Sequence, residues 1–171
     1  VTVSNVFAFD IETVPDVELG RRLHGLEGLS DKQVGYVMQT RQREQTGSEF
    51  LSLEQQRVVA ISAAMRTREG FKVWSLGEPD STEAELVRLF FDAIERYSPT
   101  LVSWNGSGFD LPVLHYRAMR HRVQAHRYWE TGDEEQSFRW NNYLGRFHWR
   151  HIDLMDVLAG YQGRGRVGLD R

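Results

Sequence analysis

The sequence predicts an α/β fold, in which helices cover a β-sheet. Three apolar stretches rich in strand-forming residues follow one another with short connections, at residues 3–11, 57–65 and 71–76, as in neighbouring antiparallel strands. A helical pattern at residues 82–97 then leads directly into a short apolar strand at residues 100–104. An amphipathic helix followed by an apolar strand is typical of α/β sheets.

The first half of the chain contains an opening strand, two helices and a long second strand. The opening strand is expected to end near Thr13, because polar residues and then Val14-Pro15 follow its apolar run. Helical patterns occupy residues 17–26 and 31–45, and Ser30 or Asp31 is a candidate N-cap for the second helix. Residues 57–65 are continuously apolar and β-branched, which predicts a strand buried on both faces.

The second half begins with a capping box formed by Thr82 and Glu85, which predicts the start of a helix. A turn at residues 105–108 precedes a helix that opens at Asp110 and extends to about residue 122. Residues 123–147 lack a clean period and are predicted to be irregular. Residues 151–158 are predicted to resume helical structure, with Asp153 as the N-cap.

Composition narrows the possible functions. With 171 residues and 40% apolar content, residues 1–171 are expected to form a single domain. The absence of cysteine excludes a disulfide framework and a thiolate metal site. A net charge of −3 argues against coating duplex nucleic acid by bulk electrostatics. The sequence has neither a membrane-length apolar run nor a signal peptide, so a cytoplasmic protein without a membrane partner is expected.

Two carboxylates stand in the opening strand. Residues i and i+2 of a strand share a face, so Asp10 and Glu12 are expected to point one way, and Phe9 and Ile11 the other. Two adjacent acids at the end of an apolar strand repel each other and are costly to desolvate without a cation. Taken alone, this short pattern favours two solvated acids at a strand end, because a short motif is weak support for a site.

A third carboxylate, Asp110, follows just past the end of the strand at residues 100–104. Strand ends in α/β sheets are where ligands bind, so Asp110 is expected to lie near Asp10 and Glu12. Three carboxylates suit Mg²⁺ or Mn²⁺, and two such ions can activate a water and stabilise the leaving oxygen of a phosphodiester. The predicted chemistry is metal-assisted hydrolysis.

These acids stand in two motifs that resemble a known family. Phe-Asp-Ile-Glu-Thr at residues 9–13 and Asn-Gly-Ser-Gly-Phe-Asp-Leu-Pro at residues 105–112 are similar to the first and second motifs of DEDD-type 3′-to-5′ exonucleases. The form is closest to the proofreading exonuclease of family-B DNA polymerases and to the stand-alone predicted exonucleases related to it. The resemblance implies an RNase H-like fold with a mixed β-sheet flanked by helices. Two motifs together favour a metal site over solvated acids.

The resemblance also implies roles for individual residues. Asp10 would bridge two metal ions, Glu12 would hold the catalytic ion and position the water, and Asp110 would hold the second ion. The backbone of Thr13 would lie beside the terminal nucleotide. Asn105 and Phe109 would shape the substrate pocket, although Phe109 is equally compatible with plain core packing.

The sequence departs from the family at the third motif, which should supply a fourth acid as Tyr-x-x-x-Asp or His-x-x-x-x-Asp. His148 with Asp153 has the second spacing, and Asp153 is also a good N-cap. The favoured interpretation is that the third motif lies after Arg171, so that this domain lacks its C-terminal part and has an incomplete site.

Two functions therefore remain open. One is a metal-dependent 3′-to-5′ exonuclease acting on single-stranded DNA or RNA 3′ ends, inactive in this form if the fourth acid is missing. The other is a non-catalytic nucleic-acid-binding or interaction module with the same fold. For the exonuclease, the candidates for contact with backbone phosphates are either Arg117, Arg120 and Arg122 or the cluster at residues 146–151, although solvated surface is the commoner role for any one of them.

Overall fold

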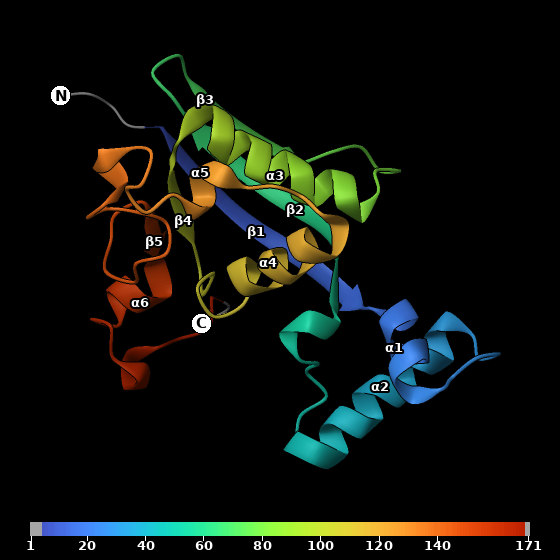
Figure 1. The fold of residues 1–171 in the computed structure, drawn as a ribbon. Coiled ribbons are helices and arrows are strands. Elements are labelled where there is room, and N and C mark those ends of the chain that lie inside the picture. The colour runs from blue at the N-terminus through green and yellow to red at the C-terminus, as the bar shows by residue number, and fades with distance from the viewer. Residues whose placement is uncertain (1–4, 170–171) are drawn as a thin grey trace.

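The computed structural model describes residues 5–169 and contains a five-stranded sheet in the order β3-β2-β1-β4-β5 (Figure 1). β1 is central, and it pairs antiparallel with β2 and parallel with β4. The edge pairs are β2 with β3, antiparallel, and β4 with β5, parallel. The predicted α/β fold with a mixed sheet is confirmed. The strands are β1 (Val6–Pro15), β2 (Gln56–Arg66), β3 (Phe71–Ser75), β4 (Thr100–Ser103) and β5 (His151–Asp153).

Helices α3 and α4 lie over one face of the sheet (Figure 1). The core beneath α3 is aromatic, because Phe7 and Phe9 of β1 contact the ring of Phe90 at centroid distances of 5.9 and 4.8 Å. Thr82 and Glu85 form the predicted capping box at the start of α3. The helices are α1 (Val17–His24), α2 (Asp31–Thr46), α3 (Glu83–Tyr97), α4 (Asp110–His121), α5 (His126–Trp129) and α6 (Leu154–Leu158), with single 3₁₀ turns η1 (Leu53–Gln55), η2 (Gln136–Phe138) and η3 (Gly163–Gly165).

The opposite face of the sheet, which we call the open face, is exposed at Asp10, Glu12 and Ser62. The prediction that β2 is buried on both faces is wrong. Its residues alternate between buried and exposed, and Val59 retains 43% of its accessible surface. A continuous apolar run indicated two covered faces, but α3 and α4 supply cover on one side of β2 only.

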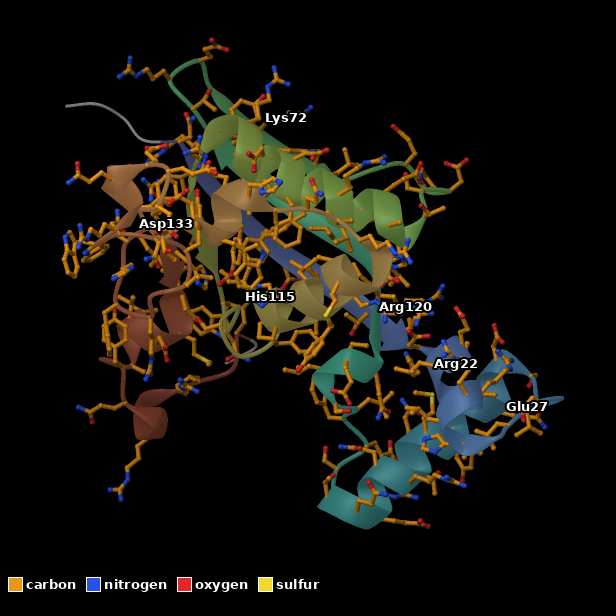
Figure 2. The ribbon with its side chains drawn as sticks, viewed as in Figure 1. Arg22, Glu27, Lys72, His115, Arg120 and Asp133 are labelled. Carbon is orange, nitrogen blue, oxygen red and sulfur yellow. The ribbon has the colours of Figure 1, made fainter. Side chains whose placement is uncertain are left out.

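Helices α1 and α2 form an arm that projects beyond the end of β1, and Arg22 and Glu27 lie in it, far from Lys72 at the other end of the sheet (Figure 2). The arm has a small core of its own, built from Val34, Met38 and Leu51. Of the two predicted N-cap candidates, Ser30 caps α2, and its side chain accepts the backbone N–H of residue 33.

The prediction of a helix over residues 151–158 is wrong in its first three residues. His151–Asp153 form β5, which pairs with β4, and only Leu154–Leu158 are helical. β4 has an edge that β1 does not occupy, so strand pairing there outcompetes the local helical preference. Asp153 is the N-cap of α6, as predicted, since its carboxylate accepts the N–H of Met155.

The excursion between α4 and β5 is largely irregular, as predicted. It contains α5 and η2, and it is held to the core by Tyr128, Phe138 and Tyr143, which are almost completely buried. Among residues 5–169, none of the helices combines the length and the apolar character needed to cross a bilayer.

Candidate metal and nucleic-acid site

Asp10 and Glu12 point out from the open face near the C-terminal end of β1, as the alternation of the strand predicts. Their neighbours Phe9 and Ile11 are buried on the helix-covered side. The pairing of β1 with β2 shifts register between Glu12 and Thr13. The residue without a partner is Val59, so the irregularity lies in β2 opposite Glu12 and Thr13, and such bulges are frequent beside active sites.

Asp110 is the first residue of α4, and only 3% of its surface is exposed. Its Oδ1 accepts a hydrogen bond from the backbone N–H of Ile11 at 3.1 Å. β4 pairs with β1 only from Val6 to Ala8, so the N–H of Ile11 has no strand partner on that side. The carboxylate of Asp110 thus accepts the N–H that a neighbouring strand would otherwise accept. It does so at Ile11, the residue between Asp10 and Glu12.

This position is electrostatically costly for Asp110. Burial, together with the negative charges of Asp10 and Asp153, raises the pKa of its carboxyl to about 6, and the hydrogen bond from Ile11 partly opposes this rise. The groups that raise the pKa of Asp110 beyond burial are therefore other acids. A cation bound among them would remove this repulsion.

A loop at residues 105–108 carries the chain from β4 to Asp110, and Asp153 fixes its shape. The carboxylate of Asp153 accepts the N–H groups of Asn105 and Ser107 at 2.9 and 3.0 Å. Asn105 has φ of 59°, and a Cβ at Gly106 would come within 2.1 Å of the Ser103 Oγ. The loop therefore needs its own residue types, and Asp153 acts as a clamp on the backbone that presents Asp110.

Of the three predicted substrate-pocket residues, Asn105 and Phe109 lie in or next to this loop, and Thr13 lies on β1. Thr13 donates its hydroxyl to the Gln56 side chain at 2.9 Å. The carbonyl oxygen of Asn105 accepts the N–H of Phe109 at 3.0 Å. The ring of Phe109 lies 5.4 Å from that of Phe50, which comes from the connection between α2 and β2 and is 59% exposed. The sequence did not single out Phe50, because its neighbours form an unremarkable polar segment.

His148 lies apart from these acids in its hydrogen bonding, since its Nδ1 accepts the N–H of Asn142 at 3.0 Å. The Oδ1 and Oδ2 of Asp153 accept the backbone N–H groups of the loop and of α6. The structure therefore brings Asp153 to the loop that carries Asp110, and it places the His148 ring in a separate turn.

A second buried polar pair adjoins the loop. Ser103 Oγ lies 2.7 Å from His151 Nε2, and both side chains are buried. Burial lowers the pKa of His151 to about 4, although Asp153 and Asp156 act in the opposite direction. His151 is therefore neutral at physiological pH and makes a neutral hydrogen bond behind the acids.

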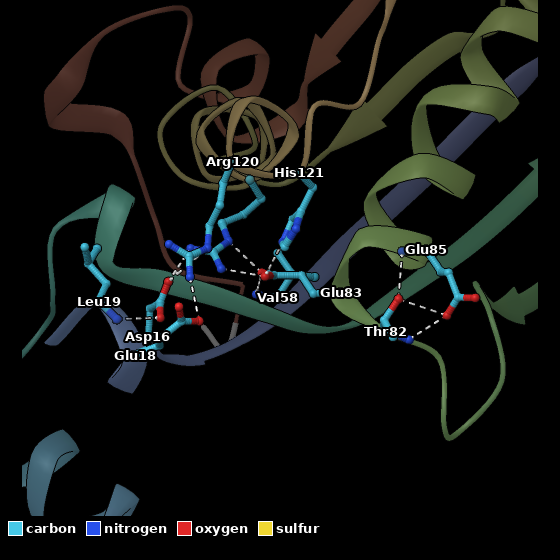
Figure 3. Close-up of polar contacts among 10 residues, drawn as sticks. Asp16, Glu18, Leu19, Val58, Thr82, Glu83, Glu85, Arg120 and His121 are labelled. Atoms are coloured by element: carbon cyan, nitrogen blue, oxygen red, sulfur yellow. Dashed lines mark hydrogen bonds and ion pairs between the residues drawn. The ribbon is translucent and has the colours of Figure 1, made fainter. Parts of the chain in front are cut away.

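The expectation that Arg117 contacts phosphates is wrong, as is the alternative of solvated surface. Its guanidinium donates to Asp16 Oδ2 at 2.7 Å and to both carboxylate oxygens of Glu83 at 2.7 and 2.5 Å. The side chain is 3% exposed. Figure 3 shows Arg120 and His121 on the same cluster, with Arg120 beside Asp16 and Glu18. These groups join α1, α3 and the C-terminal part of α4.

Residues 48–171 match a family described as "Predicted 3'-5' exonuclease related to the exonuclease domain of PolB". The chain belongs to this family. The match includes Asp110 and Asp153, whereas Asp10 and Glu12 precede it. As a family member, the chain is also similar to "DNA polymerase 1" of Sulfurisphaera ohwakuensis, with 44% identity over 43 residues, which is 25% of this chain and 5% of that protein.

Among solved structures, the chain is similar to the family B DNA polymerase from the hyperthermophilic archaeon Pyrobaculum calidifontis. The similarity has a TM-score of 0.41 and 18% identity, and it covers 89% of this chain and 15% of the polymerase. The exonuclease-family chain thus spans a small fraction of each polymerase to which it is similar.

The chemistry of the donor groups fits a divalent cation. Carboxylate oxygens are the ligands that Mg²⁺ and Mn²⁺ prefer, and Asp10 and Asp110 are within electrostatic range of each other. In the part of the chain that the structure describes, however, no three His, Cys, Asp or Glu side chains are gathered closely enough to hold a metal ion. The residues therefore have the chemistry of a cation site without its closed geometry.

Proposed function

We propose that this domain is a metal-dependent 3′-to-5′ exonuclease that hydrolyses the terminal phosphodiester bond of a single-stranded nucleic acid. The observation that carries the proposal is the position of Asp110. A carboxylate that follows β4 is buried against the backbone of β1 between Asp10 and Glu12, where the charge of Asp10 raises its pKa. Membership of a predicted exonuclease family supports the same function.

In this proposal Asp10, Glu12 and Asp110 hold Mg²⁺ or Mn²⁺. Two such ions, when bound, would supply an activated water and a stabilised leaving oxygen. The chain's own contribution is to keep Asp110 ionised and oriented. The N–H of Ile11 lowers the pKa of Asp110 against the effect of burial, and the clamp by Asp153 fixes the loop that precedes it. Thr13, Asn105 and Phe109 border the space for the terminal nucleotide.

The test uses a single-stranded oligonucleotide with a labelled 5′ end, incubated with Mg²⁺ or Mn²⁺. A ladder of products that shorten from the 3′ end supports the proposal, and Asp10→Asn and Asp110→Asn should each abolish the ladder. The control is Asp92→Asn, an exposed acid on α3, which should leave the rate unchanged. Cleavage that survives both site variants would place the activity elsewhere.

The absence of a closed cage of acids among the described residues favours a second candidate, a nucleic-acid-binding module without catalysis. The same assay separates the two functions. If the protein binds the oligonucleotide but does not shorten it at any concentration of either metal, the binding module is supported.

A further inference from the structure

The segment at residues 139–150, which we call the aromatic segment, exposes three large aromatic side chains. Trp140, Phe147 and Trp149 retain 81%, 66% and 67% of their accessible surface. Large exposed apolar groups gathered in a short segment are informative, because single scattered ones are common but clusters mark interaction sites.

These side chains are exposed from a backbone that is fixed. The side-chain oxygen of Asn142 accepts the N–H groups of Leu144 and Gly145 at 3.1 and 3.0 Å. The side-chain oxygen of Asn141 accepts the N–H groups of Trp149 and Arg150 at 2.8 and 3.1 Å. The hydrogen bonds of two asparagines thus hold the aromatic rings outward, so that little order has to be gained on binding.

The same segment is anchored to the sheet by Tyr143. Its ring is 2% exposed, and its hydroxyl donates to the carbonyl oxygen of Pro99, the residue before β4, at 2.6 Å. The anchor explains why the exposed rings have a defined place relative to the sheet.

The charge of the aromatic segment is positive. Residues 136–152 contain no Asp or Glu and contain Arg139, Arg146 and Arg150. The guanidinium of Arg139 lies 5.7 Å from the centre of the Trp140 ring, and that of Arg146 lies 5.7 Å from the centre of the Phe147 ring. The guanidinium of Arg146 is bound by the carboxylate of Asp156, so Arg139 beside Trp140 gives the combination that accepts a phosphate and a stacked base together.

The aromatic segment is continuous with the candidate site. A cavity of about 230 Å³ is lined on one side by Ser107, Leu111 and Pro112, from the loop and helix that carry Asp110, and on the other by Leu144 and Arg146. The cavity therefore lies between the segment that carries Asp110 and residues 144–146 of the aromatic segment.

We propose that the aromatic segment binds a single-stranded nucleic acid, with bases stacked on Trp140, Phe147 and Trp149 and with phosphates held beside Arg139. The inference rests on the proposed function in that the bound strand would end at Asp110. Single strands fit because their base faces are accessible, whereas a duplex has its base faces stacked inside. The lack of acids in residues 136–152 favours a polyanion over a basic protein partner.

The test measures binding of fluorescein-labelled oligothymidylate, oligouridylate and a DNA duplex by anisotropy in EDTA, where cleavage does not contribute. Trp140→Ala and Trp149→Ala should each weaken single-strand binding about tenfold, and the double variant about a hundredfold. Trp149→Phe should retain most of the affinity, because it retains a ring. Phe71→Ala, at a 70% exposed aromatic on the opposite edge strand β3, should stay within about twofold of the wild type.

Tight binding of either single strand that the tryptophan variants lose supports the proposal. The proposal is overturned if the double variant, folded by circular dichroism, binds as tightly as the wild type, if the duplex binds best, or if neither single strand binds. Asp10→Ala separates this proposal from the proposed function. If this variant loses cleavage and keeps binding, both the exonuclease function and the binding by the aromatic segment are supported. If the wild type binds through the aromatic segment but never cleaves, only the exonuclease function is contradicted.

Discussion

Helix α4 carries a buried charged group near each end, and the two are treated differently. Near its C-terminal end, Arg117 is surrounded by Asp16 and Glu83, so each buried charge has an opposite charge within 2.7 Å. At its N-terminal end, Asp110 has a backbone N–H as a partner and other acids as electrostatic neighbours.

The difference is reflected in the pKa values of the two acids. Burial would raise the pKa of Asp16, but the N–H of Leu19 and the guanidinium of Arg117 hold it below its ordinary value. Burial raises the pKa of Asp110 to about 6, and no arginine opposes it. The buried charges at the C-terminal end of α4 are thus neutralised by opposite charges. The negative charge of Asp110 at the N-terminal end is not, and a bound cation would neutralise it.

The largest effect is expected at the compensated end. Arg117→Met should destabilise the protein by about 3 to 5 kcal/mol, because Asp16 and Glu83 would be left buried without a counter-charge. Urea unfolding at pH 7.5 measures it. Arg43→Met removes an exposed pair with Glu49 and should change stability by less than about 1 kcal/mol. Similar losses from the two variants would mean that the buried cluster is not compensated as described.

Removing the charge of Asp110, at the N-terminal end of α4, should increase the stability of the protein instead of decreasing it. A folded pKa of about 6 against an ordinary value of 3.8 means that Asp110 stabilises the fold only when protonated, and that this stability is lost as pH rises through 6. In EDTA at pH 7.5, Asp110→Asn should therefore raise the free energy of unfolding by up to about 3 kcal/mol. The gain should disappear near pH 4.

Asp156→Asn is the matched control for that prediction. Asp156 is 2% exposed like Asp110, but hydrogen bonds from Arg146 lower its pKa, with Arg166 adding to the effect. Its asparagine variant should lose stability at pH 7.5. Equal signs for the two variants would contradict the comparison of compensated and uncompensated acids.

A bound cation should neutralise part of the negative charge around Asp110, at the N-terminal end of α4. Millimolar Mn²⁺ should stabilise the wild type by about 1 kcal/mol, the amount expected at a concentration several times the dissociation constant. Asp10→Ala should abolish this gain. Thermal unfolding with and without Mn²⁺ measures it, and an unchanged melting temperature of the wild type at millimolar metal would count against the site.

The smallest effect is expected at the neutral pair behind the acids. Ser103→Ala removes the hydrogen bond to His151 and should cost about 1 kcal/mol. Since the pKa of His151 is about 4, the loss should be the same at pH 6.5 and pH 8. A loss that grows between these values would mean that His151 titrates near neutrality.

Features that depend on local sequence were predictable. The capping box at Thr82 and the N-caps at Ser30 and Asp153 each involve residues within three positions, and all three are confirmed. The facing of Asp10 and Glu12 follows from strand alternation alone.

Features that depend on distant partners were not. β5 is three residues long and exists because β4 has a free edge, which no local pattern reports. Arg117 meets Asp16 across 101 positions, so a basic stretch could not be told from a buried cluster. The contact of Phe50 with Phe109 and the clamp by Asp153 also join segments that only the folded chain brings together.

The hydrogen bond from Ile11 to Asp110 makes one amide proton a spectroscopic reporter. Because the carboxylate accepts the backbone N–H of Ile11 at 3.1 Å, any change in its charge alters the shielding of that proton. The amide signal of Ile11 should therefore titrate with an apparent midpoint near pH 6, while that of Phe7, deep in the core of the same strand, stays still. Nuclear magnetic resonance could thus follow the protonation of Asp110, the binding of a metal ion and the binding of a nucleic-acid strand through the amide signal of Ile11 alone. No label has to be placed among the acids.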